Sequence, residues 1–401
     1  MNYPSVILKK DKEKSIERKH PWVFSGAIQK IVVDTTPPEP LTDGQLVNVF
    51  DEHNNFLATG HFQDGTIAVR IISFTQELID DDFWFKRLTN AFELRKALGL
   101  TENLSTNIYR LIHAEGDQLP GLIIDFYNGT AVIQSHSAGM HFAKPQIVAA
   151  LQKIYGKKLL AIYDKSAETL EKQTDLKIEN GYLYQAENPE LIGTEYDCNY
   201  HLDWVEGQKT GFFIDQRENR KLLGELAKDK LVLNTFCYSG GFSVAALKNG
   251  AKAVHSVDSS KKAIELTDKN IELNQLTNHQ SFVSDTLTFL KENKEVYDII
   301  VLDPPAYAKH RKSMHKAVQG YKRLNEMALK NMKSGGLLFT FSCSQVINRK
   351  LFYDTIMAAA ISSQRNVRVL YHLSQPTDHP VNIFHPEGEY LKGLVLQVFD
   401  F

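Results

Sequence analysis

The feature that most constrains the fold is an alternation of apolar runs and helical patterns in the second half of the chain. Four apolar runs are predicted to be buried strands: Leu231-Val232-Leu233, Ala253 to Val257, Tyr297 to Leu302 and Leu337 to Phe341. Helices are predicted between them, from Phe242 to Lys248, from the Ser259-Ser260 cap to Asn274, and near residues 315 to 332. Alternation of this kind indicates βαβ units, and we expect an α/β domain with a mostly parallel sheet over residues 191–401.

The first half of the chain has a different pattern. Residues 1–74 contain short apolar runs separated by Gly, Asn and Asp, which is typical of an all-β domain. Within it, His20 to Gly26 is expected to be a compact aromatic turn, and the proline-rich stretch from Thr35 to Leu41 a loop. Residues 75–190 combine helical spacing from Trp84 to Arg95 with the apolar run Leu122 to Tyr127, which predicts a small α+β domain.

Composition narrows the function classes. No apolar run approaches the roughly 18 to 20 residues that cross a bilayer, and the N-terminus has no signal-peptide pattern. Cys198, Cys237 and Cys343 are too widely spaced for a disulfide framework or a zinc cluster. We therefore expect a cytoplasmic protein with no membrane partner and no metal.

The charge balance bears on nucleic-acid binding. Lys plus Arg is 46 and Asp plus Glu is 48, a net charge of −2, so binding to RNA would require a local basic surface. The run from Lys9 to His20 is the candidate, with Lys10, Lys12 and Arg18 among its basic residues. A merely solvated charged face is the alternative.

A glycine turn between the first strand and its helix predicts a cofactor site. Two glycines, Gly240 and Gly241, allow a sharp turn and close approach of a ligand, although a plain connection is the alternative. Asp258 ends the next strand, where a carboxylate accepts hydrogen bonds from ribose hydroxyls. Asp285 follows a further short strand at Phe282-Val283 and could reach an adenine amino group. Because no pyrophosphate-binding pattern is present, S-adenosylmethionine is favoured over a nicotinamide dinucleotide.

Two further strand ends predict the chemistry. Asp303-Pro304-Pro305 follows one strand and Ser342-Cys343-Ser344 follows another, so a carboxylate and a thiol should lie at one sheet edge. The prolines remove backbone donors and leave carbonyls that can accept from an exocyclic amine, with Asp303 facing a ring nitrogen. A turn with no role in binding is the alternative. Cys343 is either a small core residue or a nucleophile.

A thiolate at this position would suit methylation of a pyrimidine at carbon-5. Addition of Cys343 to carbon-6 makes carbon-5 nucleophilic enough to attack the methyl sulfonium. A base must then remove the carbon-5 proton, and Asp303, Glu387 and a water molecule are candidates. Cys237 is expected to serve packing, and Cys198 is given no role.

With these residues in view, the chain closely resembles the large-subunit ribosomal RNA cytosine-C5 methyltransferases that carry an N-terminal PUA domain. The likeness covers nearly the whole length. Its motifs are His20 to Gly26, Glu115 to Gly121, Gly207 to Arg217, Asn234 to Phe242, Val257-Asp258, Asp303-Pro304-Pro305, Phe341 to Ser344, Asp378-His379-Pro380, Pro386-Glu387-Gly388 and Tyr390 to Gly393.

The resemblance implies a PUA-like domain at 1–74, a central domain at 75–190 and a Rossmann-like class I methyltransferase domain at 191–401. It also implies that S-adenosylmethionine is bound by the loop from Phe236 through Ser239 to Gly241 and by Asp258, with Cys343 as nucleophile. Gln216 is added by analogy with uracil-C5 RNA methyltransferases. Ribosomal RNA is the expected partner, and a homodimer is one candidate assembly.

Two alternatives stay open at this point. An amino-group RNA methyltransferase would use Asp303-Pro304-Pro305 to hold the exocyclic nitrogen, with Cys343 structural. A non-catalytic RNA-binding factor for ribosome assembly would keep the fold with a vestigial cofactor pocket. Identifying the modified nucleoside tests the first alternative. Measuring S-adenosylmethionine binding tests the second.

Overall fold

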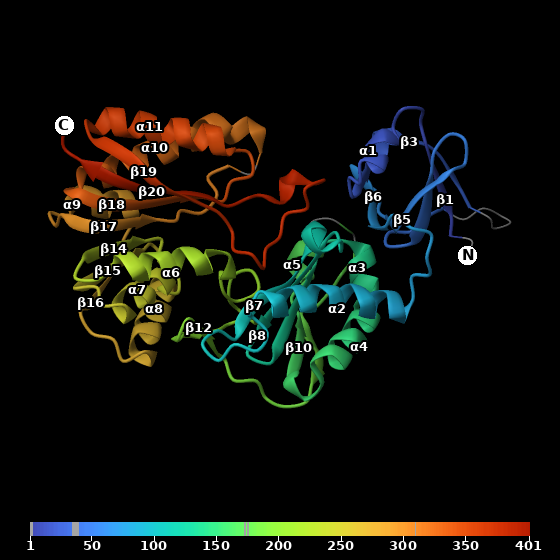
Figure 1. Cartoon of the computed structure of the whole chain (residues 1–401), viewed down its shortest axis with the longest axis horizontal. Coiled ribbons are helices and arrows are strands. Elements are labelled where there is room, and N and C mark those ends of the chain that lie inside the picture. Colours follow the sequence, from blue (N-terminus) through green and yellow to red (C-terminus); the bar gives the residue numbers. More distant parts are fainter. Residues whose placement is uncertain (1–2, 34–39, 172–173, 175, 309) are drawn as a thin grey trace. The chain divides into compact units, whose positions relative to one another are not determined.

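The computed structural model describes residues 3–33, 40–171, 174, 176–308 and 310–401, and Figure 1 shows its elements. The predicted proline-rich loop falls largely outside the described residues. The chain divides into two compact units. Unit 1 comprises residues 1–191, 202–212 and 377–388, and unit 2 comprises residues 192–201, 213–376 and 389–401. Unit 2 therefore excludes two stretches that lie within the predicted range 191–401.

Unit 1 begins with a six-stranded sheet, in keeping with the predicted all-β region. The strands have the order β2-β6-β5-β4-β1-β3, and every pair except β1 with β4 is antiparallel. Alternating apolar side chains such as Val47 and Val49 are buried in its core. The elements are β1 (Ser5–Leu8), α1 (Lys14–Glu17), β2 (Trp22–Phe24), β3 (Ile28–Val32), β4 (Leu46–Phe50), β5 (Phe56–Phe62) and β6 (Ile67–Ser73).

The expected aromatic turn at His20 to Gly26 is wrong for most of its length. Trp22–Phe24 is a strand that pairs with β6, with Trp22 opposite Arg70 and Val23 opposite Val69. Val23 is buried while Trp22 and Phe24 are more exposed, which is the two-residue period of a strand. Only the 3₁₀ turn Ser25–Ala27 bends the chain, so the partner strand rather than the local aromatic cluster decides the conformation.

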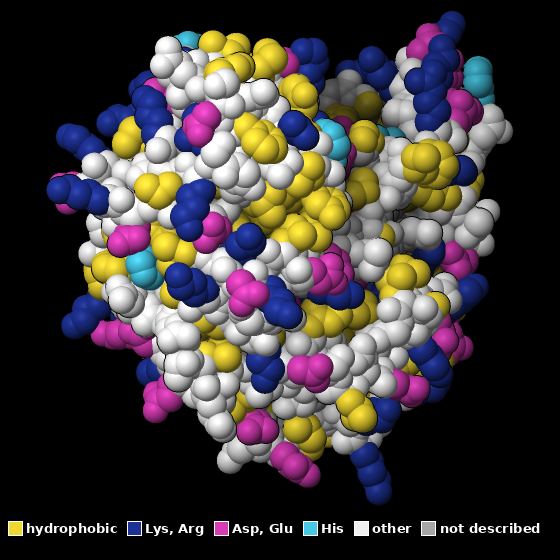
Figure 2. All heavy atoms as spheres, turned by 60° about the vertical axis from the view of Figure 1, so that its left-hand side comes forward, with side chains coloured by type: hydrophobic (Ala, Val, Ile, Leu, Met, Phe, Trp, Pro, Cys, Tyr) yellow, Lys and Arg dark blue, Asp and Glu magenta, His cyan; other side chains and the backbone are white. Residues whose placement is uncertain are grey.

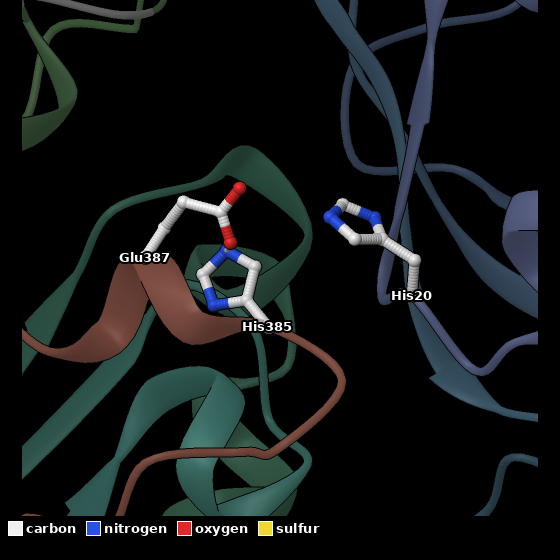
Figure 3. A group of neighbouring side chains, drawn as sticks. All are labelled: His20, His385 and Glu387. Atoms are coloured by element: carbon white, nitrogen blue, oxygen red, sulfur yellow. Dashed lines mark ion pairs between the residues drawn. The ribbon is translucent and has the colours of Figure 1, made fainter.

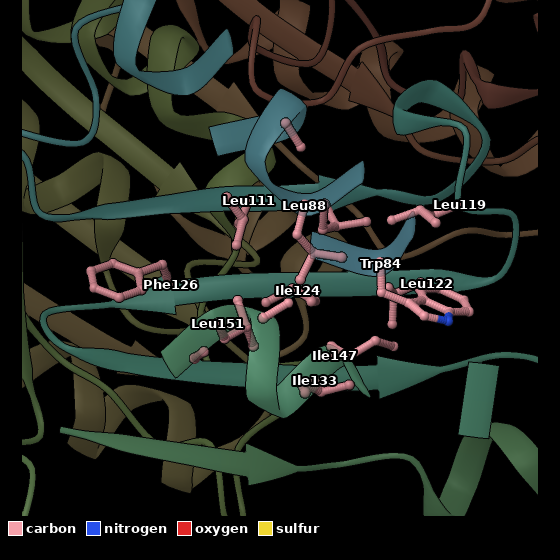
Figure 4. Close-up of a cluster of buried hydrophobic side chains, with 14 of the residues drawn as sticks. Trp84, Leu88, Leu111, Leu119, Leu122, Ile124, Phe126, Ile133, Ile147 and Leu151 are labelled. Atoms are coloured by element: carbon pink, nitrogen blue, oxygen red, sulfur yellow. The ribbon is translucent and has the colours of Figure 1, made fainter. Parts of the chain in front are cut away.

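The second sheet of unit 1 has five strands in the order β11-β10-β9-β8-β7. Two long helices contact each other and cover one face, where Trp84 and Leu88 of α2 meet Ile147 and Leu151 of α4 (Figure 4). Asp80 caps α2 by accepting a hydrogen bond from the Phe83 N–H at 3.0 Å. The elements are α2 (Asp81–Ala97), β7 (Ile108–His113), β8 (Leu122–Tyr127), β9 (Thr130–Ser135), α3 (Ala138–Phe142), α4 (Lys144–Tyr155), β10 (Ala161–Asp164), α5 (Ala167–Leu170) and β11 (Gly181–Gln185).

Unit 2 is built on a seven-stranded sheet in the order β16-β15-β14-β17-β18-β20-β19, which confirms the predicted α/β class. The first five strands are parallel, and β20 is antiparallel to both neighbours. The strands are β14 (Leu231–Thr235), β15 (Ala253–Asp258), β16 (His279–Val283), β17 (Tyr297–Leu302), β18 (Met332–Ser342), β19 (Asn366–Leu373) and β20 (Lys392–Phe399).

Helices cover both faces of this sheet (Figure 1). One group contains α6, α7 and α8, and the other contains α10 and α11, which pack against each other. Ser260 caps α8 as predicted, accepting from the Ala263 N–H. The helices are α6 (Arg217–Leu226), α7 (Gly241–Lys248), α8 (Lys261–Leu273), α9 (Thr286–Glu292), α10 (Met314–Lys330) and α11 (Arg349–Ser363), and a small hairpin joins β12 (Ile192–Glu195) to β13 (Cys198–His201).

The surface carries both signs of charge. Figure 2 shows Lys and Arg side chains interspersed with Asp and Glu over the visible face, as the net charge of −2 leads one to expect. Among the described residues, none of the helices has the length and apolar character that a bilayer crossing requires.

Candidate cofactor and reaction site

The candidate site lies at the carboxyl edge of four neighbouring parallel strands. Register pairs Thr235 of β14 with Val257 of β15 and with Leu302 of β17, and Leu302 with Thr340 of β18. The segments that follow these strands therefore share one edge, where open α/β sheets bind their ligands. They contain the glycine turn, Asp258, Asp303 and Cys343.

The turn from Phe236 to Gly241 has an unusual backbone. Phe236, Tyr238 and Gly240 have φ angles of 54°, 47° and 72°, which only glycine adopts without strain. Side chains of α8 hold the loop: Thr267 donates to the Tyr238 carbonyl at 3.0 Å, and Asn270 donates to the Ser239 carbonyl at 2.8 Å. Strained residues held by neighbours in this way are typical of ligand-binding loops.

Both glycines of the turn lie against neighbouring side chains. A Cβ at Gly240 would lie 2.6 Å from Cγ2 of Thr267, and one at Gly241 would lie 2.9 Å from Cδ of Arg220. Arg220 is itself held by two hydrogen bonds of 2.7 Å to Glu195. The absence of side chains therefore lets the loop pack between α6 and α8, in addition to any approach by a ligand.

Asp258 ends β15, as predicted, and helps to shape the glycine turn. Its Oδ2 accepts from the Tyr238 N–H at 3.1 Å, and its Oδ1 accepts from the Ser260 N–H at 2.9 Å. A carboxylate has about four acceptor positions, so both oxygens retain capacity for ribose hydroxyls. The carboxylate thus joins the loop to the predicted nucleoside position.

Asp285 has a structural role that was not predicted from the sequence. It is the N-cap of α9, and its Oδ1 accepts from the N–H and the hydroxyl of Thr288 at 3.0 and 3.1 Å. The residue is exposed. Its contact with an adenine amino group remains a prediction.

Asp303 and Gln216 come together although they are far apart in sequence. Gln216 donates a hydrogen bond to the Asp303 carboxylate, and its own Oε1 accepts from Asn219 at 2.6 Å. Burial, together with the charge of Asp215, raises the pKa of Asp303 to about 7 against the lowering effects of Gln216 and Arg220. Asp303 can therefore hold or release a proton near neutral pH.

Cys343 lies directly after β18, one residue beyond the pairing of Ser342 with Lys392. The side chain of Lys392 is buried, and its ammonium donates to the carbonyls of Ser344 and Tyr390 at 2.8 and 2.6 Å. Burial lowers the pKa of Lys392 to about 8, while the charge of Cys343 raises it. The ammonium thus lies against the backbone that follows Cys343 and interacts with the charge of its thiolate.

The three cysteines differ in accessibility. Cys343 is partly exposed, whereas Cys198 and Cys237 are buried. Burial raises the pKa of Cys198 to about 11 and that of Cys237 to about 12, so both stay protonated at neutral pH. Sequence reasoning had already set these two cysteines apart from Cys343.

Two residues of the site were missed by the sequence analysis. Lys392 belongs to the motif from Tyr390 to Gly393, but no role for it follows from the sequence, because its position depends on the insertion of β20 beside β18. Asp215 precedes Gln216; its Oδ2 accepts from the Tyr390 hydroxyl at 2.8 Å, while its Oδ1 is buried without a hydrogen-bond partner among the described residues. Glu387, a candidate base, belongs to unit 1, where it lies on the 3₁₀ turn Pro386–Gly388.

The residues present fit S-adenosylmethionine. The strained turn, the carboxylate of Asp258 and the partnerless Oδ1 of Asp215 provide a backbone cradle and acceptors for hydroxyl and amine donors. Such a set matches a cofactor with a ribose and an amino-acid moiety and without phosphates.

Comparison with known proteins agrees with this assignment. Residues 6–74 match a PUA-like domain and residues 187–382 match an S-adenosylmethionine-dependent methyltransferase. A methyltransferase structure from Streptococcus mutans has a TM-score of 0.82 at 25% identity, covering 98% of this chain and 99% of that one. Another methyltransferase structure, complexed with S-adenosylhomocysteine, has a TM-score of 0.83 at 26% identity, with 98% and 99% coverage.

Curated relatives match over the full length. Proteins from Tolumonas auensis and Aeromonas hydrophila, each named ribosomal RNA large subunit methyltransferase I, are 39% and 38% identical over 98% of this chain and 99% of theirs. S-adenosylmethionine is thus the cofactor, as predicted. The chain, which combines a PUA-like domain with an S-adenosylmethionine-dependent methyltransferase domain, belongs to the ribosomal RNA large subunit methyltransferase I family.

Proposed function

We propose that this protein methylates carbon-5 of a cytosine in large-subunit ribosomal RNA, with Cys343 as nucleophile. The names of the relatives support the RNA substrate. The choice of carbon-5 rests on one observation: the partly exposed cysteine follows a strand next to that of Asp303, at the edge that carries the cofactor loop. Methylation of an exocyclic amine requires no thiol at this position.

The first step is addition of the Cys343 thiolate to carbon-6 of the flipped-out base. A new S–C6 bond forms, and the electrons of the 5,6 double bond move to carbon-5 or into the ring. The Lys392 ammonium favours the thiolate over the thiol because it places a positive charge beside it. Lys392 therefore acts through Cys343, as a positioning residue.

Asp303 acts on the other side of the ring. With a pKa of about 7 it is partly protonated at neutral pH and can donate a proton to ring N3 as the adduct accumulates charge there. Gln216 holds the carboxyl group by its hydrogen bond. The carbonyls flanking Pro304 and Pro305 can accept from the exocyclic amine, which uracil lacks.

S-adenosylmethionine supplies the methyl group as an electrophile bonded to a positively charged sulfur. Carbon-5 takes the methyl group and S-adenosylhomocysteine leaves. The carbon-5 proton is then lost, and the electrons of its bond rebuild the 5,6 double bond as the Cys343 thiolate departs. Ring N3 returns its proton to Asp303, which restores the starting state of the site. We propose water as the proton acceptor, because water reaches the partly exposed Cys343.

The test is to methylate large-subunit RNA from a strain lacking this gene and to identify the product nucleoside by mass spectrometry. The wild-type protein should yield 5-methylcytidine, and Cys343→Ala should yield none while still binding S-adenosylhomocysteine. Cys198→Ala is the matched control and should retain activity. Full methylation by Cys343→Ala, or a product methylated on an amino group, would overturn the proposal.

A further inference from the structure

We propose that His20, His385 and Glu387 of unit 1 form a binding site for a divalent transition-metal ion, with Zn²⁺ as the ion best matched by the ligands. Figure 3 shows the three side chains converging from two segments far apart in sequence. Cysteine spacing gave no reason to expect a metal. His20 is near the N-terminus, whereas His385 and Glu387 are near the C-terminus. A site whose ligands are so far apart in sequence has no local pattern that would reveal it.

The ligand atoms are close to the geometry that zinc requires. One nitrogen or oxygen from each residue lies within 4.8 Å of the others, and His385 Nε2 lies 3.8 Å from Glu387 Oε2. That separation is too long for a hydrogen bond. Tetrahedral zinc with bonds of about 2.0 to 2.2 Å places its ligands roughly 3.3 to 3.6 Å apart. Small side-chain rotations therefore suffice to bring the three onto one ion.

His385 provides independent evidence for a missing ligand. Its side chain is only 3% exposed, yet neither Nδ1 nor Nε2 has a hydrogen-bond partner among the described residues. A buried polar group left unpaired costs about 1 to 3 kcal/mol. A metal ion at Nε2 would remove half of this deficit and explain why a histidine is buried here.

The ring of His385 is held in place by its surroundings. The Trp22 ring packs against it at a centroid distance of 4.3 Å and an angle of 62°. The backbone N–H of His385 donates to the Asn382 carbonyl at 2.8 Å, and the N–H of Gly388 donates to the His385 carbonyl at 3.2 Å. This turn also places Glu387 two residues after His385 with its carboxylate facing the ring (Figure 3).

His20 has the second-sphere contact expected of a metal ligand. Its Nδ1 lies 3.2 Å from the Trp22 carbonyl, and a proton on Nδ1 donated to this oxygen leaves the Nε2 lone pair free. The Trp22 N–H lies at the same distance from Nδ1 and favours the other tautomer without metal, so metal binding would select the first. The Trp22 indole N–H donates to Glu115 at 2.9 Å, which adds a second carboxylate to the surroundings.

The donor set selects the ion. Imidazole nitrogens suit zinc, copper, nickel and iron, whereas calcium and magnesium prefer all-oxygen sites. Two histidines with one glutamate, and a fourth position filled by water, are a known zinc arrangement. Zn²⁺ is therefore the ion to test first, with Co²⁺ as a spectroscopic substitute.

The test uses the full-length protein, stripped of metal with a chelator and titrated with Zn²⁺ by calorimetry. We expect one ion per chain, with at least tenfold weaker binding for His385→Ala and for Glu387→Gln. Because Glu387 is exposed, the second variant tests the site even where the first fails to fold. His53→Ala is the matched control: His53 Nε2 lies 3.6 Å from Glu52 Oε1 in an exposed pair, and no third metal-binding side chain joins this pair among the described residues.

Cysteine thiolates are the main competitors for zinc, so Cys343→Ala is titrated in parallel and should bind with wild-type affinity. The Co²⁺ complex should show the absorption of nitrogen and oxygen ligands without a thiolate charge-transfer band. Zn²⁺ should also raise the thermal midpoint of the wild type by more than that of Glu387→Gln. No saturable binding by the wild type, or wild-type affinity in both site variants, would overturn the proposal.

Discussion

The ammonium of Lys392 donates a hydrogen bond to the carbonyl oxygen of Ser344 at 2.8 Å. Ser344 directly follows Cys343, and Ser342 on its other side pairs with Lys392 across the two strands. The lysine therefore holds the backbone on both sides of the proposed nucleophile. Because it is buried, its charge is poorly screened by water and acts on the thiol more strongly than a surface lysine would.

Lys392→Met should slow alkylation of Cys343 at neutral pH by roughly tenfold, because the thiolate loses its cation. The measurement is the rate of iodoacetamide labelling of the Cys343 peptide against pH, by mass spectrometry. Lys392→Arg should restore most of the rate. Since the pKa of Lys392 is about 8, the lysine loses its charge above that pH, and its stabilisation of the Cys343 thiolate should decrease even in the wild type.

Lys350→Met is the control for this measurement. Lys350 is an exposed lysine of α11, paired with Asp354 at 2.7 Å. Its loss should leave the labelling profile unchanged. If Lys392→Met also left the pH midpoint unchanged, the lysine would have a structural role alone.

Gly240→Ala should destabilise the fold and weaken binding of S-adenosylhomocysteine. The backbone there has φ of 72°, and the new methyl group would lie 2.6 Å from Thr267, which holds the Tyr238 carbonyl. Gly335→Ala is the matched control, since Gly335 has φ of 85° but nothing within 4 Å of the added Cβ. It should show only the strain of about 1 to 2 kcal/mol.

Urea unfolding measures the stability of the two glycine variants, and calorimetry measures their affinity for S-adenosylhomocysteine. The account requires the Gly240 variant to lose affinity while the Gly335 variant keeps it. Equal ligand affinity in the two variants would show that the turn is not part of the cofactor site.

Asp303→Asn should become more stabilising as pH rises. The pKa of Asp303 is about 7 in the fold against 3.8 as the ordinary value, so the folded protein retains a proton that the unfolded chain loses. Wild-type stability therefore falls between about pH 4 and pH 7 by at most about 4 kcal/mol, and the asparagine removes this loss. The urea midpoint of ligand-free protein, measured at several pH values, tests the sign.

Asp298→Asn is a control of opposite sign in β17. Burial raises the pKa of Asp298, but hydrogen bonds from the Leu231 N–H and from Lys333 lower it overall. The wild-type carboxylate therefore stabilises the fold above pH 4 and loses this effect as pH falls, so the variant should be less stable at pH 7. A pH-independent difference for Asp303→Asn would contradict the assignment of its pKa.

The basic run near the N-terminus should contribute to RNA affinity. Lys9 donates to the Gly26 carbonyl and Lys14 pairs with Asp11, whereas Lys10 and Arg18 are exposed and make no ion pair among the described residues. Changing Lys10 and Arg18 together to Glu should weaken RNA binding and lower the salt slope by roughly 0.7 to 0.9 for each lost phosphate contact. Filter binding at several salt concentrations measures the slope.

Lys261→Glu serves as the comparison for the basic run. Lys261 is an exposed lysine of α8 that pairs with Glu265 at 3.7 Å. Its change should leave the salt slope unaltered. An unaltered slope in the Lys10 and Arg18 double variant would remove this surface from the RNA site.

Local patterns were sufficient where structure depends on neighbours in sequence. Buried parallel strands are continuous apolar runs, so β17 was predicted with the bounds it has, and the cap at Ser260 marked the start of α8. The ends of these strands then placed Asp303 and Cys343 at one edge without knowledge of the structure. The topology of parallel sheets makes that inference general.

Strand pairing between segments far apart in the chain could not be predicted from the sequence. β20 inserts antiparallel between β18 and β19, and no local signal reports that choice, so Lys392 received no role. Trp22–Phe24 is a strand because β6 supplies its partner. The convergence of His20 with His385 likewise requires the fold, because neither residue has a ligand-like neighbour pattern of its own.

The most direct test of the central claim uses RNA in which cytidine is replaced by 5-fluorocytidine. Fluorine at carbon-5 cannot leave as a proton does, so an enzyme that adds a thiol to carbon-6 and methylates carbon-5 stays covalently attached. With S-adenosylmethionine present, the wild-type protein should form a complex with this RNA that survives denaturing gel electrophoresis, and Cys343→Ala should form none. A wild-type protein that methylates unmodified RNA yet forms no such complex would contradict the account.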